Sequence, residues 1–93
     1  MFVGILSVEL HIPSSGSLKS KRQVIKCVKD RIKAHFNASI SEVDMHDKWQ
    51  RSVLGIACIG NDKKYINGVL CRIADFIRNY RQAEIINTKM EIW

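Results

Sequence analysis

Residues 2–36 read FVGILSVELHIPSSGSLKSKRQVIKCVKDRIKAHF and contain the clearest structural pattern of the chain. Its first eleven residues alternate between two sets of side chains, which is the period of a half-buried strand. Pro13 ends that strand, and residues 14–17 form a short turn whose serines are suited to cap a helix. From there to about Phe36 the apolar residues fall within one narrow arc at helical spacing. The stretch therefore predicts a strand followed at once by an amphipathic helix.

The rest of the chain supplies three more strands and one more helix. Residues 38–45 read as a second strand whose apolar phase slips, which predicts a bulge near Ser41 and Glu42. Residues 49–59 read as a third strand, close enough to the second to form a hairpin. Asn61 and Asp62 cap a second helix with a clean apolar stripe, and residues 84–93 alternate as a last strand.

The order β-α-β-β-α-β allows few architectures, because each β-α-β crossover is right-handed and both helices then cover the same face of one sheet. We expect an α+β ferredoxin-like sandwich, with two helices on one face of a four-stranded, mainly antiparallel sheet, as a single domain over residues 1–93. In that arrangement we expect the first and third strands to lie side by side and parallel at the centre. The amino ends of both helices would then emerge along one edge of the sheet.

Composition indicates an ordinary globular domain. The 93 residues are 46% hydrophobic and 26% charged, and no apolar run approaches the roughly 20 residues that cross a bilayer. The first residues begin a strand pattern and lack the features of a signal peptide. Cys27, Cys58 and Cys71 are odd in number and widely spaced, so we expect three free thiols. These features predict a cytoplasmic protein without membrane contact.

Five short blocks of the sequence stand out, namely LHIP at 10–13, SLKSKR at 17–22, EVD at 42–44, WQR at 49–51 and GND at 60–62. In their order and spacing they resemble the YlxP-like family of bacterial proteins, a domain of unknown function, over essentially the whole chain. The resemblance implies a ferredoxin-like fold. It also implies a setting, because genes of this family often lie among those for translation initiation and ribosome maturation. It implies no catalytic residues.

The positive excess of the chain sits on its first helix. The net charge is +6, and residues 17–36 hold seven basic residues and one acid, Asp30, whereas the remaining charges cancel. Five of these cations fall within about 80° of a helical wheel, in a stripe about 21 Å long. Because unpaired like charges at this spacing repel, the pattern favours a polyanionic partner such as RNA or a ribosomal particle. A solvated helix face is the structural alternative, and an anionic membrane or an acidic protein patch would compete as partners. The predicted contacts are Lys19, Lys21, Arg22, Lys26, Lys29 and Lys33.

A second candidate site involves the amino ends of both helices. Lys63 and Lys64 open the second helix, although cations normally favour carboxyl ends. If both amino ends reach one edge of the sheet, these lysines, the cations of the first helix and the hydroxyls of Ser15 and Ser17 would surround a common anion. The structural alternative is that the lysines extend into water.

The open face of the sheet predicts a protein contact. We expect Val3, Ile5, Val53, Ile59 and Ile85 on this face, without the aromatic residues on which RNA-recognition motifs stack bases. A patchy aliphatic surface suits a homodimer or a protein partner in translation or ribosome maturation. Trp49, flanked by Arg51, is expected to clamp the hairpin or to serve as an interface anchor.

Catalysis has little support in the sequence. No nucleophile–base pair is visible, so we expect a non-enzymatic binding module without a cofactor. His11, Asp44, His46 and Asp47 match no metal-ligand spacing, and no metal site is expected. A small hydrolase of phosphate esters at the shared helix edge is the remaining enzymatic alternative.

Overall fold

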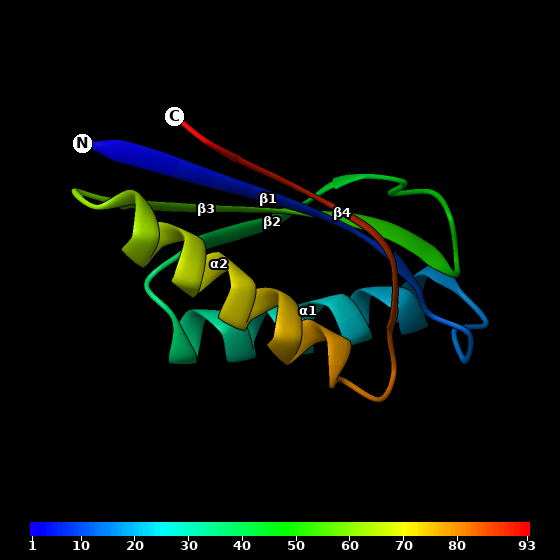
Figure 1. The fold of residues 1–93 in the computed structure, drawn as a ribbon. Coiled ribbons are helices and arrows are strands. Elements are labelled where there is room, and N and C mark those ends of the chain that lie inside the picture. Colours follow the sequence, from blue (N-terminus) through cyan, green and yellow to red (C-terminus); the bar gives the residue numbers. More distant parts are fainter.

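The computed structural model describes all 93 residues as a β-α-β-β-α-β domain. The strands are β1 (Phe2–His11), β2 (Ser39–Asp44), β3 (Arg51–Gly60) and β4 (Glu84–Ile92), and the helices are α1 (Leu18–His35) and α2 (Lys63–Arg78). Both helices lie on one face of the sheet, and the other face is open (Figure 1). The predicted ferredoxin-like α+β architecture is therefore confirmed.

Local signals set the ends of both helices. Ser17 is the N-cap of α1, because its Oγ accepts a hydrogen bond from the Ser20 N–H at 3.0 Å. Asp62 caps α2 in the same way through the Lys64 N–H at 2.9 Å. The apolar stripe of each helix faces the sheet, where it joins the inner residues of β1 and β3 in one core of 19 buried residues.

The strands are ordered β2-β3-β1-β4, and every neighbouring pair is antiparallel. The expectation that β1 and β3 are parallel was wrong. The crossover through α1 makes β2 parallel to β1 but leaves room for one strand between them, and the β2–β3 hairpin turns β3 back into that space. Phe2 therefore lies opposite Gly60, and His11 lies opposite Arg51.

This reversal sends the amino ends of the helices to opposite ends of the molecule. Helix α1 begins where β1 ends, whereas α2 begins where β3 ends, beside the start of β1. The Lys63 ammonium accordingly lies 5.1 Å from the centroid of the Phe2 ring.

Two bulges shift the register of the edge strands. The predicted bulge in β2 occurs one or two residues later than expected, at Val43 between the pairs formed by Glu42 and Asp44. A second bulge, which the sequence did not reveal, falls in β4 and brings Ile85 opposite Leu10. Ile85 therefore packs against the core, and its predicted place on the open face was wrong.

Candidate functional site

Five cationic side chains line one side of α1, and we call them the basic flank. Only Lys26 has a carboxylate partner, Asp30, whose Oδ2 lies 2.7 Å from the ammonium. The other four make no ion pair within the molecule, and all five are exposed except Lys29, which is half-buried. The flank therefore presents a row of largely uncompensated charge. Its members are Lys19, Arg22, Lys26, Lys29 and Lys33.

The basic flank points away from α2. The opposite side of α1 carries Arg31, whose guanidinium lies 5.4 Å from the Tyr80 ring centroid, and His35, whose ring lies 5.8 Å from that of Phe76. Because α1 lies over β2, an edge strand, the flank faces solvent beyond that edge. A long ligand can thus follow the helix without meeting α2.

Lys21 does not belong to this surface, and its predicted contact with nucleic acid was wrong. Its side chain is fully buried, because position 21 is in phase with the apolar positions 25, 28 and 32 of the helix. The ammonium donates hydrogen bonds to three backbone carbonyls of the β2–β3 connection and pairs with one carboxylate. The partners are the carbonyls of Met45 at 2.8 Å, His46 at 3.2 Å and Arg51 at 3.2 Å, and Glu42 Oε2 at 3.0 Å.

The serines and lysines of the proposed common anion site are also separated. Ser15 is buried and its Oγ donates to the Ser17 carbonyl at 3.1 Å, while the Ser17 Oγ serves as the helix cap. Lys63 and Lys64 are exposed, but they lie at the other end of the sheet. A single anion site built from both helix ends was therefore wrong, because it rested on parallel central strands.

Four of the five sequence blocks instead meet around two packed loops. Gln50 Nε2 donates to the carbonyls of Pro13 and Ser15, each at 3.2 Å, and the Gln50 carbonyl accepts from the Ile12 N–H at 2.8 Å. Glu42 holds Lys21 and also accepts from the Ser52 Oγ at 2.6 Å. These contacts tie the β1–α1 loop to the β2–β3 connection. Glu42, Gln50 and Ser52 were missed as structural partners, and the apolar phase of Lys21 was the one signal that could have indicated such a network.

The open sheet face carries the four expected aliphatic side chains, Val3, Ile5, Val53 and Ile59. Ile59 is 61% exposed and Ile5 is 42% exposed. Val3 and Val53 are half-buried between their neighbours on the same face. No element of the chain covers this surface.

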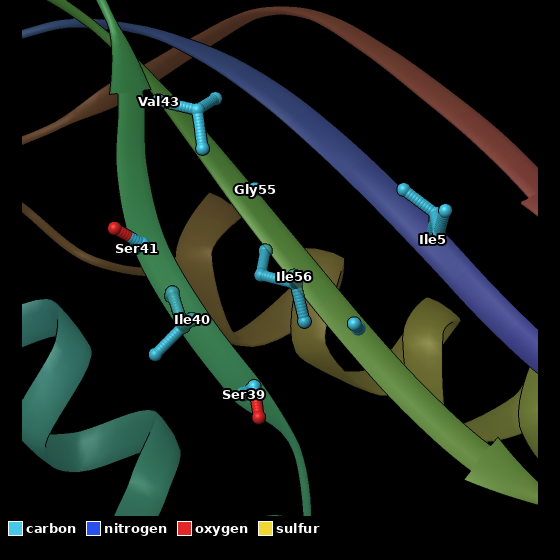
Figure 2. A pocket seen from close by; sticks show the side chains of 8 residues that line it. Ile5, Ser39, Ile40, Ser41, Val43, Gly55 and Ile56 are labelled. Carbon is cyan, nitrogen blue, oxygen red and sulfur yellow. The ribbon is translucent and has the colours of Figure 1, made fainter.

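A shallow hollow of about 290 Å³ lies on this face. Figure 2 shows Ile5 on β1 and Val43 on β2 on either side of it, with the backbone of Gly55 on β3 between them. A Cβ at position 55 would lie 2.9 Å from Val43 Cγ1, so the missing side chain of Gly55 lets Val43 lean over the sheet. The hollow is apolar and open, which suits contact with an aliphatic surface.

Trp49 and Arg51 lie at the end of the sheet where the β2–β3 connection returns. Trp49 is 57% exposed, so its ring is available for contact with a partner. The Arg51 guanidinium pairs with the Glu9 carboxylate on the open face.

Other chemistry is sparse. No group of three or more His, Cys, Asp or Glu side chains lies close enough to hold a metal ion. All three cysteines are free thiols, with Cys58 in the core and Cys27 and Cys71 exposed on the helices. Neither helix is long and apolar enough to span a membrane.

Comparison with known proteins agrees with the blocks described above. The sequence model of a family described as "Protein of unknown function (DUF503)" matches residues 3–90. The chain is also 36% identical over 89 residues to the uncharacterized protein YlxP of Bacillus subtilis (strain 168), covering 96% of this chain and 97% of that protein. The resemblance to YlxP-like proteins is thereby confirmed.

Proposed function

Because this chain belongs to the DUF503 family of unknown function, its role has to be argued from its own surfaces, and we propose that it is a cytoplasmic, non-enzymatic module that binds RNA phosphates through the basic flank. The observation that carries the proposal is the row of four cations without carboxylate partners on one exposed side of α1. A ribosomal particle is the RNA-containing partner that the family resemblance suggests.

The arrangement suits a phosphate backbone rather than individual bases. Lysine ammonium groups act as point charges on flexible stems, and they neutralise phosphates without reading sequence. The flank carries no exposed aromatic side chain on which bases could stack. We therefore expect affinity that depends weakly on sequence and strongly on salt.

Salt dependence is the first test. With about five phosphate contacts, the logarithm of the binding constant should fall with the logarithm of salt concentration at a slope between about −3 and −4. Fluorescence anisotropy with a labelled single-stranded RNA, repeated at several salt concentrations, measures this slope. A slope near zero would exclude a phosphate-dominated contact.

Charge reversal locates the contact on the protein. The triple change Lys26→Glu, Lys29→Glu and Lys33→Glu should abolish binding while thermal unfolding stays almost unchanged, because these side chains are at the surface. The matched control reverses Lys63, Lys64 and Arg72 on α2, which changes the net charge equally but leaves the flank intact. Equal loss in both triples would mean that only net charge matters, and binding that survives the flank triple would reject the proposal.

A further inference from the structure

We propose that the open sheet face is the interface of a homodimer, in which a second copy of this chain covers the same face. This inference does not depend on RNA binding, because the face lies on the side of the sheet opposite α1.

The apolar part of the face is larger than scattered exposed residues would give. Ile5 and Val43 line the hollow, and Ile59 lies beyond it on β3, opposite Val3. Trp93, which is 69% exposed, extends the patch because it pairs with Val3 through two backbone hydrogen bonds. Exposed aliphatic and aromatic groups gathered in this way typically mark a contact surface. We call these four side chains the sheet patch.

The area of the face fits a small dimer. Strands β1 and β3 have ten residues each, β4 has nine and β2 has six, so a spacing of about 4.8 Å and a rise of about 3.3 Å per residue give a face of roughly 550 Å². Two such faces together bury about 1,100 Å², just above the roughly 1,000 Å² that a biological interface should clear. A second copy therefore supplies enough surface for a stable but modest dimer.

The charges favour this face over the helix layer. Two copies that met through α1 would oppose two basic flanks, whereas the open face has both signs, with Arg51 and Lys89 beside four carboxylates. A two-fold contact brings each position of a surface against a different position of the same surface, so a face of mixed sign can complement itself. The carboxylates are Glu9, Asp44, Glu84 and Glu91.

One pair of charges has the geometry for such a contact. Lys89 and Glu91 lie two residues apart on β4, point to the open face and have no ion-pair partner within the molecule. A two-fold axis that crosses the strands at the level of Met90 and Leu6 would set Lys89 of one copy against Glu91 of the second copy, and the reverse. The same axis would set Gly55 of one copy, with the Val43 side chain that lies over it, against the small Ala57 of the other copy.

The first test is the mass of the full chain in solution, measured by light scattering after size exclusion over a range of concentrations. We expect twice the chain mass of 10.7 kDa for the wild-type protein. Ile59→Asp should raise the dissociation constant about tenfold or more, because it places a charge in the covered patch. Tyr65→Asp is the matched control, since Tyr65 is 57% exposed on α2 and lies away from the face. A monomeric wild-type chain, or a dimer indifferent to Ile59→Asp, would overturn the proposal.

A charge exchange tests the two-fold geometry without altering the patch. Lys89→Glu and Glu91→Lys should each dissociate the dimer, because each places like charges opposite one another. An equimolar mixture of the two variants should restore a dimer with one copy of each, and so should the double variant as a homodimer. If the mixture stays monomeric while both variants remain folded by circular dichroism, this interface is wrong. Dissociation by the flank triple of Lys26, Lys29 and Lys33 would indicate head-to-tail contact instead.

Discussion

Lysine side chains on the two sides of α1 lie in opposite environments. On the inner side Lys21 is fully buried, and its ammonium is held by three carbonyls and the Glu42 carboxylate. On the outer side the basic flank lies in water, and only Lys26 has a partner. A count of basic residues treats the two sides alike, whereas the helical phase of each residue separates them. Charge density on a helix therefore indicates binding only after the inward-facing cations have been set aside.

The largest effect on stability should come from removing the Lys21 ammonium on the inner side of α1. Lys21→Met would leave Glu42 without its cation and three carbonyls without a donor, which should cost about 3–5 kcal/mol of unfolding free energy. The exposed control Lys33→Met should change stability by less than about 0.5 kcal/mol. Urea unfolding followed by circular dichroism compares them. If both variants unfold at the same urea concentration, Lys21 contributes no more than a surface lysine.

A smaller effect is expected from the partner of Lys21. Glu42→Gln keeps the size of the side chain and an acceptor oxygen for the Ser52 hydroxyl. It removes the negative charge that faces the buried Lys21 ammonium. We expect a loss of about 1–3 kcal/mol, because a hydrogen bond between charged groups becomes one to a neutral amide. The same urea experiment measures it. A loss equal to that of Lys21→Met would show that the carboxylate, rather than the carbonyls, accounts for the whole anchor.

The smallest effect on stability is expected from the ion pair between Lys26 and Asp30 on the outer side of α1. The hydrogen bond from the Lys26 ammonium holds the pKa of Asp30 below its usual range, and the same contact raises the pKa of Lys26. Because the pKa of Asp30 is lowered by folding, the contact contributes its stability above the ordinary carboxyl pKa and loses it as the pH falls through the lowered value. An NMR titration of the Asp30 carboxyl should show the lowered pKa, and Lys26→Gln should raise that pKa toward the usual range, although Lys33 and Lys29 still lower it. A normal pKa for Asp30 in the wild-type protein would mean that the pair does not persist in solution.

Much of the fold was predictable because each helix or strand has a recognisable pattern within its own residues. The alternation in β1, the apolar arcs of both helices and the caps Ser17 and Asp62 depend on neighbours within a few residues, and the structure agrees with them. The direction of β3 relative to β1 depends instead on where the hairpin inserts, which no local period records. The bulge in β4 could not be predicted because Ile85 and Ile86 are both isoleucines. A register shift between them leaves the alternation of apolar and polar residues unchanged.

The candidate site was predictable only in part, for a similar reason. The basic flank follows from helical spacing, and its members Lys19, Arg22, Lys26, Lys29 and Lys33 lie together on α1. The burial of Lys21 could have been suspected from its phase, but its partners lie 21 to 30 positions further along the chain and follow no motif. The prediction of one anion site at the amino ends of both helices was wrong, because it depended on β1 and β3 being parallel.

The burial of Lys21 has a practical consequence for chemical labelling. Amine-reactive reagents modify accessible ammonium groups, and every other lysine of the chain is exposed or half-buried. In the folded protein Lys21 should remain unmodified while the other lysines acquire label, and it should become reactive only when the β2–β3 connection separates from α1. Mass spectrometry of a single peptide would then report local opening at this end of the molecule, without any engineered probe.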